Sequence, residues 1–252
     1  CFSCETRRTD DGEDFKYFNK PKRQMFDVIQ GDIKPLLKRK IPEKTCKLFN
    51  YQVGTYNNKS VHIANYFDKS GIKAQHLRFP NKEFIWLGDT KNLMLFGQNL
   101  WRDKGKICVV TEGEIDALSI STVQNNKYPV VSVPNGAQSS SKAIATNIEW
   151  LEGFDEIVFL MDNDGPGLEC AKECASILSP GKAKIGQLPL KDANEMLVAG
   201  RGSEIIDAIF GAKVFRPDGI VAGTDTYELL IEEDKNQSVQ YPWNGLNNLT
   251  KG

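Results

Sequence analysis

The chain has 252 residues, 40% of them hydrophobic and 26% charged, which is enough apolar material for one large domain or two small ones. No run approaches the roughly 18 apolar residues of a membrane span and no signal-peptide pattern occurs, so neither a membrane nor a secreted protein is expected. The charge is uneven: residues 1–105 carry 20 Lys and Arg against 12 Asp and Glu, whereas residues 106–252 carry 12 against 21. A basic half beside an acidic half is typical of a protein that holds a polyanion on one part and a metal ion on the other; ordinary solvated charge is the alternative.

Six cysteines are present, at positions 1, 4, 46, 108, 170 and 174. Cys1 and Cys4 form a Cys-x-x-Cys pair, which is half of a four-cysteine zinc ribbon, and no second pair occurs in the sequence. A thioredoxin-type redox motif is disfavoured because no strand–helix–strand pattern surrounds the pair. The chain also opens on Cys1 rather than Met and stops at Gly252, which suggests a fragment of a longer protein.

Residues 1–41 are polar, become basic from Lys34 to Lys40 and show little periodicity, so they are interpreted as the cysteine pair followed by a tether. In residues 42–105, short segments of alternating or clustered apolar residues are separated by Asn57-Asn58 and Ser70-Gly71. That pattern predicts a meander of antiparallel strands. The expected strands are residues 51–53, 61–67, 72–77 and 84–87.

Basic side chains lie within this meander, and aromatic rings lie close to them in the sequence. The combination suits phosphates or single-stranded nucleic acid, but a solvated strand face over an aromatic core explains it equally well. The basic candidates are Lys73, His76, Arg78 and Lys82, and the aromatic neighbours are Phe79, Phe84 and Trp86.

From residue 106 onward, short apolar runs alternate with segments of helical periodicity. The expected strands are residues 107–110, 129–133, 157–161 and 183–188, and the expected helices are residues 114–124, 139–151, 166–178, 193–198 and 204–210. Continuously apolar strands are typical of a sheet that is buried on both faces. The alternation therefore predicts a small parallel sheet with helices on both sides.

Acidic side chains follow the strands of this predicted sheet. Glu112 comes directly after the first strand, Asp162 and Asp164 come after the third, and Asp192 opens a later helix. Ligands bind at the carboxyl ends of parallel strands, where these groups meet. Converging carboxylates repel one another unless a divalent cation lies among them, and oxygen ligands suit Mg²⁺ or Mn²⁺ rather than zinc. The alternative is a set of acidic loop ends on an ordinary α/β domain.

Three motifs occur in a characteristic order: Glu112-Gly113-Glu114 with Asp116, then Asp162-Asn163-Asp164-Gly165, then Lys191-Asp192-Ala193-Asn194-Glu195. Together they resemble the TOPRIM domain and, more narrowly, the primase half of bifunctional bacteriophage primase-helicases. The resemblance covers most of the chain. It implies a TOPRIM α/β domain, a small parallel sheet with helices on both faces, preceded by a basic and mainly antiparallel α+β subdomain.

The resemblance also implies a reaction, RNA primer synthesis on single-stranded DNA from ribonucleoside triphosphates with Mg²⁺ or Mn²⁺. Glu112, Asp162 and Asp164 would be the catalytic carboxylates, and with Asp192 they would bind the metal. Arg78 and Lys82 match basic positions of the family, whereas His76 stands where phage relatives carry lysine. The candidates for nucleotide and template binding are Lys73, His76, Arg78, Lys82 and Lys191.

Further parts of the protein are implied in the same way. Cys1 and Cys4 match the last two ligands of the family's zinc ribbon, so Zn²⁺ is expected only in the intact protein. Residues 1–41 would be the remnant of that ribbon with a linker, 42–105 the basic subdomain, 106–213 the catalytic domain and 214–252 a linker toward a helicase domain that forms a hexameric ring. A replicative DNA polymerase is a further expected partner, and the cytoplasm of an infected bacterium the expected setting.

Two alternatives use the same residues differently. Another TOPRIM enzyme, a nuclease or topoisomerase, would cut nucleic acid with the same metals, although no tyrosine has the context of a topoisomerase nucleophile. A catalytically inactive DNA-binding or assembly module of a replicative helicase is the second alternative. The intact Glu112, Asp162, Asp164 and Asp192 argue against it, whereas His76 and the incomplete cysteine pair leave it open. Such a module would bind DNA without needing Mg²⁺.

Overall fold

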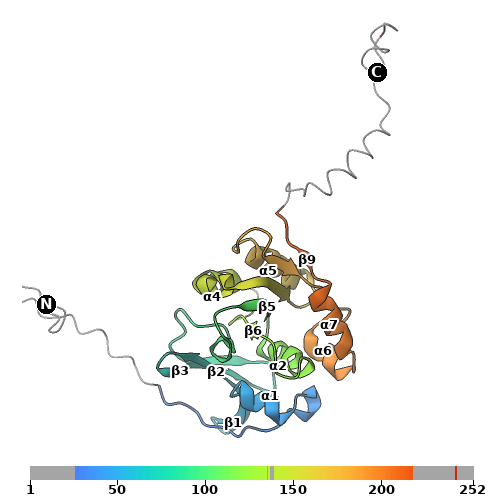
Figure 1. The fold of residues 1–252 in the computed structure, drawn as a ribbon. Helices are drawn as coiled ribbons and strands as arrows, with labels where there is room; N and C mark the ends of the chain where they lie inside the picture. The colour runs from blue at the N-terminus through green and yellow to red at the C-terminus, as the bar shows by residue number, and fades with distance from the viewer. Residues whose placement is uncertain (1–25, 135, 137–138, 218–241, 243–252) are drawn as a thin grey trace, which may run out of the picture.

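The computed structural model describes residues 26–134, 136, 139–217 and 242 (Figure 1). Cys1, Cys4 and most of the predicted linker lie outside the described residues. Two sheets lie next to each other in the fold, the first antiparallel and the second mainly parallel. No helix in the described ranges has the length and apolar character needed to cross a bilayer.

The first sheet is an antiparallel meander in the order β1-β2-β3-β4. Its strands are β1 (Gln52–Tyr56), β2 (Lys59–Asp68), β3 (Gly71–Arg78) and β4 (Phe84–Gly88). Asn57 and Asn58 make the first turn with φ values of 48° and 59°, a left-handed conformation that asparagine tolerates better than most residues. The predicted meander is confirmed.

The segment before this sheet is part of the fold, so the tether predicted for residues up to 41 is wrong over residues 26–41. Gln75 both accepts from the Ile29 amide, at 2.8 Å, and donates to the Ile29 carbonyl, at 2.9 Å. Asp32 pairs with Val53, and the side chain of Ile41 is only 1% exposed. A segment held by isolated bridges has no sequence period, which explains why the pattern suggested a tether.

The second sheet has the order β6-β5-β7-β8-β9. Its strands are β5 (Gly105–Thr111), β6 (Val130–Ser132), β7 (Phe154–Leu160), β8 (Ala183–Ile185) and β9 (Lys213–Val214). All neighbours pair in parallel except β8 and β9, which pair antiparallel. The parallel sheet is confirmed; the two-residue edge strand β9 was not predicted because it is too short to show a period.

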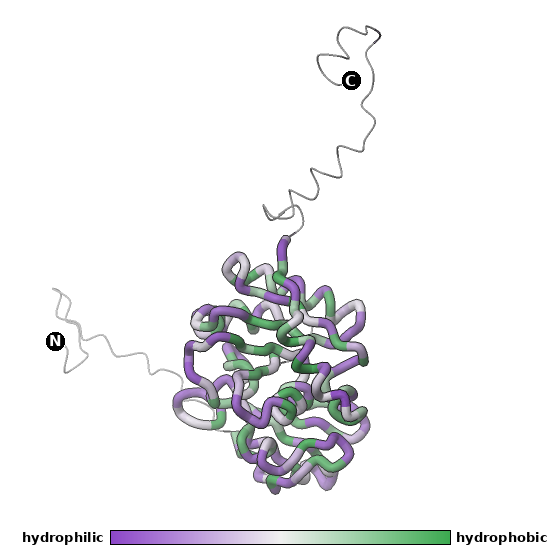
Figure 2. Tube along the Cα trace, turned by 45° about the vertical axis from the view of Figure 1, so that its right-hand side comes forward, coloured by the Kyte–Doolittle hydropathy of each residue, from purple (hydrophilic) through white to green (hydrophobic). Residues whose placement is uncertain are grey.

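Helices cover both faces of the parallel sheet, as predicted. One face packs on α2 (Glu114–Val123), α6 (Ala193–Val198) and α7 (Gly202–Phe210). The other packs on α3 (Ser140–Thr146), α4 (Ile148–Glu152) and α5 (Gly165–Ala175). Successive residues of β5 point to opposite faces, with Val109 in the first core and Val110 in the second. Hydrophobic stretches accordingly run through the interior of the fold in Figure 2.

The single helix predicted for residues 139–151 is interrupted at Asn147, which separates α3 from α4. The Asn147 side-chain amide donates to the carbonyls of Leu93, at 3.0 Å, and Ala143, at 2.9 Å. An asparagine side chain that bonds nearby carbonyls competes with the helical backbone pattern. The 3.6-residue period of the apolar residues continues across the break, so the pattern did not reveal it.

The two sheets share one hydrophobic core. It includes Tyr66 of the first sheet, Phe96 of the connection and Val109 of the second sheet, together with residues of α1 (Glu43–Leu48). Phe96 also bridges to Ser132 of β6, with backbone hydrogen bonds of 2.9 and 3.2 Å. The position of the first sheet relative to the carboxyl ends of the second is therefore set by packing as well as by chain connection.

Candidate functional site

Four carboxylates gather where the parallel strands β5 and β7 end, and Glu112, Asp162, Asp164 and Asp192 are together called the acidic edge. The two strands are neighbours, and Thr111 at the end of β5 pairs with Leu160 at the end of β7. Glu112 follows Thr111 directly and Asp162 lies two residues beyond Leu160. The adjacency of the two strands therefore brings together side chains that are fifty residues apart in the sequence.

Asn163 ties the loop after β7 to the loop that carries Asp192. Its amide donates to the Lys191 carbonyl at 2.6 Å, and its side chain donates to the Leu188 carbonyl at 2.9 Å. The Lys191 ammonium consequently lies 3.9 Å from Oδ2 of Asp162. Lys191, predicted as a phosphate ligand, is thus brought to the acidic edge.

Two members of the acidic edge also cap helices. Oδ1 of Asp164 accepts from the Gly167 amide at 2.9 Å, and Oδ1 of Asp192 accepts from the Glu195 amide at 2.7 Å. Positive helix N-termini stabilise carboxylates, and each cap uses one carboxylate oxygen only. A Cβ at position 167 would lie 2.2 Å from the Asp162 carbonyl oxygen, so glycine there allows the close turn that presents both Asp162 and Asp164.

The electrostatics of the edge are those of crowded like charges. Burial, Glu112 and Asp192 raise the pKa of Asp162 to about 6, against the opposing effect of Lys191. Burial raises the pKa of the adjacent Asp116 carboxyl to about 8, and Asp192 and Asp162 contribute in the same direction. Each group lacks enough positive charge nearby to stay ionised at its ordinary pKa.

The donor set of the acidic edge consists of carboxylate oxygens, which suits Mg²⁺ or Mn²⁺ better than zinc. No three His, Cys, Asp or Glu side chains in the part of the chain described here form a ready-made ion site. Mg²⁺ usually takes one or two protein carboxylates and completes its shell with waters and substrate phosphates, so three protein ligands are not required. Metal binding by these residues stays a prediction, which the like-charge crowding at Asp162 supports.

His76 and Glu114 form a second, buried arrangement behind this edge. Nδ1 of His76 lies 2.6 Å from Oε1 of Glu114, and the Tyr66 hydroxyl donates to the same oxygen at 2.9 Å. Burial raises the pKa of Glu114, but the interaction with His76, together with hydrogen bonds from the Glu114 backbone and Tyr66, lowers that pKa overall. His76, predicted to bind nucleotide or template, is directed to this contact between the two sheets, with only 9% of its surface exposed.

A pocket of about 430 Å³ lies beside the acidic edge and is strongly basic. It is called the basic pocket, and its cationic and histidine lining residues are Lys34, Lys38, Arg39, His62, Arg78 and Lys82. Arg39 donates to Oδ1 of Asn194 at 2.8 Å, and the Asn194 amide donates to Asp116 at 3.0 Å. This chain of contacts joins the wall of the basic pocket to Asp116, whose carboxyl is close enough to Asp162 and Asp192 of the acidic edge to feel their charge.

The structure thus brings Arg78 and Lys82 into one pocket, together with basic residues that sequence reasoning did not assign. Lys34, Lys38 and Arg39 lie in and around the short 3₁₀ helix η1 (Leu37–Arg39), within the basic run that was interpreted as a tether. The sequence feature that could have identified these three residues is the basic run from Lys34 to Lys40. Asn194 was visible in its motif, but its role as a link became evident only in three dimensions.

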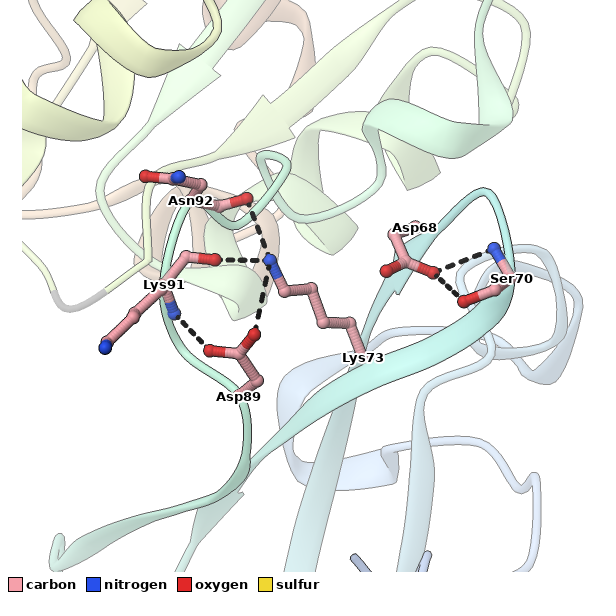
Figure 3. Close-up of polar contacts among 6 residues, drawn as sticks. All are labelled: Asp68, Ser70, Lys73, Asp89, Lys91 and Asn92. Carbon is pink, nitrogen blue, oxygen red and sulfur yellow. Dashed lines mark hydrogen bonds and ion pairs between the residues drawn. The ribbon is translucent and has the colours of Figure 1, made fainter. Parts of the chain in front are cut away.

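Lys73, like His76, is a predicted binding residue that does not line the basic pocket (Figure 3). Its ammonium donates to the carbonyls of Lys91 and, at 3.2 Å, Asn92, and lies 3.8 Å from Oδ2 of Asp89. The side chain is 13% exposed and does not line the basic pocket. Lys73 therefore holds the loop that leads from β4 toward the second sheet.

We expect Lys73→Met to lower the free energy of unfolding by about 1 kcal/mol, because three acceptors lose their cation. Urea unfolding measures this change, and Lys69→Met, at an exposed lysine of the same hairpin, is the control. Affinity for single-stranded DNA should be unchanged in the folded variant. A weaker affinity with unchanged stability would instead support Lys73 as a binding residue.

Comparison with known proteins agrees with this geometry. A family model described as the N-terminal α+β fold of bacteriophage T7 DNA helicase/primase matches residues 31–88, and a Toprim-like model matches residues 109–197. Fold and site therefore define a TOPRIM-type domain preceded by a T7-type α+β subdomain, which confirms the predicted fold class.

Individual relatives narrow the family. The DNA helicase/primase of Enterobacteria phage T3 is 35% identical over 232 residues, which is 90% of this chain and 41% of that protein. A crystal structure of the primase fragment of the bacteriophage T7 primase-helicase is 36% identical, with 75% of this chain and 80% of that chain covered at a TM-score of 0.70. The chain belongs to the bacteriophage primase-helicase family and corresponds to its primase half.

A third match is a structure of the bacteriophage T7 lagging-strand DNA polymerase interacting with primase domains of two gp4 subunits bound to an RNA/DNA hybrid and dTTP. It is 35% identical, and 76% of this chain and all of that chain are covered, with a TM-score of 0.71. The predicted family resemblance is confirmed by these three matches.

Proposed function

We propose that this chain synthesises short RNA primers on single-stranded DNA from ribonucleoside triphosphates, with Mg²⁺ or Mn²⁺. The observation that carries the proposal is the hydrogen-bonded link from Arg39 in the basic pocket through Asn194 to Asp116, whose carboxyl lies close to Asp162 and Asp192 of the acidic edge. Polyphosphate and template backbone need cations, whereas a metal-dependent reaction at phosphorus needs carboxylates, and the fold presents both side by side. Membership of the primase-helicase family supports the same function.

The reaction forms one bond between a 3′-hydroxyl oxygen and an α-phosphorus and breaks the bond to the leaving pyrophosphate. A divalent ion, when bound, lowers the pKa of the hydroxyl and neutralises charge on the phosphates. Asp162 and Asp164 would hold it, Asp192 would be a further ligand or orient the others, and Glu112 would act as ligand or accept the hydroxyl proton. Lys191, next to Asp162, would contact the triphosphate.

Arg78 and Lys82 would bind phosphates of the nucleotide or the template, together with Arg39 from η1. Lys82 lies at the tip of the β3–β4 turn with φ of 66°, in a turn closed by a 2.9 Å bond from the Phe79 amide to the Glu83 carbonyl. This placement projects an exposed lysine from a rigid hairpin. His76 and Lys73 would act indirectly, by holding the protein surface in place.

Partners beyond the substrates follow by comparison with relatives. The T7 structure contains a lagging-strand DNA polymerase in contact with primase domains, and a replicative DNA polymerase is proposed as a partner here. The chain corresponds to 41% of the T3 helicase/primase, so a covalently attached helicase domain, a hexameric ring and a complete zinc ribbon including Cys1 and Cys4 are proposed for the intact protein. Its setting would be the cytoplasm of an infected bacterium.

Replacing Asp162 by Asn should lower incorporation of labelled ribonucleotide on single-stranded DNA on the order of 100-fold or more, because the metal loses a charged ligand while the side-chain volume is kept. Asp164→Asn should do the same and retains an oxygen for the helix cap. Glu169→Gln, at an exposed acid on α5, is the matched control and should retain full activity.

Normal synthesis by Asp162→Asn would contradict the site assignment. Metal-dependent cleavage of the DNA by the wild-type chain, without incorporation, would instead indicate a TOPRIM nuclease. DNA binding that needs no metal, with neither reaction, would indicate an inactive binding module.

Lys82→Gln should weaken binding of single-stranded DNA and lower the slope of log affinity against log salt concentration by about 0.7, since one phosphate contact is lost. Fluorescence anisotropy across a salt series measures both quantities. Lys127→Gln is the control, because Lys127 lies before β6, at the opposite end of the strands from the acidic edge. An unchanged slope in Lys82→Gln would place Lys82 outside the nucleic-acid interface.

A further inference from the structure

Four rings of the first sheet contact one another in series and are called the aromatic column: Tyr66, Trp86, His76 and Phe84. The Tyr66 ring is tilted by 59° against Trp86. Ring centroids are 4.9 Å apart between Tyr66 and Trp86, 4.3 Å between Trp86 and His76, and 5.1 Å between His76 and Phe84. The last two contacts are nearly parallel, with interplanar angles of 11° and 21°. The register of the sheet produces this stack, because His76 pairs with Trp86 on the neighbouring strand.

Arg78 continues the column at its outer end. It pairs with Phe84 across the two strands, and its guanidinium carbon lies 5.5 Å from the centroid of the Phe84 ring. Residues 76 and 78 share one face of β3, because side chains alternate along a strand. Arg78 also lines the basic pocket, so the end of the column and the pocket meet at this residue.

The outer end of the column is its exposed end, while Trp86 within the column is half-buried. Tyr66 is 1% exposed and His76 is 9% exposed, whereas Phe84 is 48% exposed. Tyr66 and His76 are in turn bonded to Glu114 of the TOPRIM domain. The outermost ring is therefore accessible but rests on a rigid, buried support.

Single exposed apolar residues are common on proteins, so exposure of Phe84 alone means little. Two further observations distinguish it from its neighbour Ile85, which is 39% exposed on the opposite face of the same strand. The Phe84 ring is ordered by His76 on the column and by the Arg78 guanidinium, and it lies beside the basic pocket. An ordered aromatic ring next to clustered cations is the combination with which proteins bind single-stranded nucleic acid.

We propose that Phe84, with Arg78, is a stacking platform for one nucleobase whose phosphates lie in the basic pocket. This proposal rests on the proposed function. It adds a contact with the nucleobase, which does not depend on the charge of the phosphates. Because the ring is already fixed, stacking costs little additional ordering of the protein. The base belongs either to the template or to the incoming nucleotide, and the two are separated by the choice of probe.

For the template, fluorescence anisotropy compares a short single-stranded DNA with an oligomer of equal length built from abasic units. Wild-type protein should prefer the intact oligomer, and Phe84→Leu, which keeps apolar bulk but no ring face, should reduce this preference roughly ten-fold. Phe84→Tyr should keep the preference. Ile85→Ala, at the other exposed apolar residue of β4, is the matched control and should behave as wild type.

For the nucleotide, calorimetric titration compares ATP with inorganic triphosphate, which has the phosphates but no base. If the platform holds the incoming nucleotide, Phe84→Leu should lose roughly ten-fold of the preference for ATP and leave the affinity for inorganic triphosphate unchanged. Circular dichroism and thermal unfolding of each variant confirm that the fold is kept.

Equal base preference in wild type, Phe84→Leu and Phe84→Tyr with both probe pairs would overturn the platform. So would an equal loss for base-containing and base-free ligands, because that result indicates a general disturbance of the pocket. These measurements do not require catalysis. A wild-type chain that shows the Phe84-dependent preference but incorporates no ribonucleotide would support the platform while contradicting the proposed function.

Discussion

Repulsion among the carboxylates of the acidic edge is the constraint on which the rest of this structure depends. The strand order causes this repulsion, because β5 and β7 are neighbouring parallel strands and each is followed by acidic residues at its carboxyl end. The fold offsets part of the cost by placing Asp164 and Asp192 at helix N-termini and Lys191 near Asp162. Burial and the remaining repulsion from Glu112 and Asp192 together raise the pKa of Asp162 to about 6, and a divalent cation would favour its charged form.

The first sheet provides the opposite charge at the right place. Tyr66 and His76 attach it to Glu114, just beyond Glu112 in the sequence, and the shared core around Phe96 keeps the two sheets together. The basic pocket is consequently held next to the acidic edge, with Arg39 and Asn194 between them. The basic half of the chain thus supplies cations for a polyanion, and the acidic half supplies carboxylates for a metal. Packing of the two sheets brings these groups close together.

The parallel sheet and the positions of Glu112 and Asp162 were predictable from sequence. The apolar runs show where the strands end, and the carboxyl ends of parallel strands lie at the same edge of the sheet. The position of the Lys73 side chain was not predictable: Tyr66 pairs with Ala74 and Phe67 with Ile72, so Lys73 lies at a register shift where strand alternation is interrupted. The role of residues 34–41 was not predictable, since isolated bridges such as Leu36 with Ile41 leave no period. The contact between Arg39 and Asn194 joins residues 155 positions apart and has no local signature.

Electron paramagnetic resonance of Mn²⁺ added to the metal-free chain shows whether the acidic edge binds a divalent ion, because the signal reports free Mn²⁺ without requiring nucleotide or activity. A metal site at the acidic edge predicts that the wild-type chain removes Mn²⁺ from solution, that affinity increases as the pH rises through about 6 while Asp162 loses its proton, and that Asp162→Asn binds far more weakly. Mn²⁺ that remains free at all pH values, or that binds the Asn variant as tightly as wild type, would contradict it.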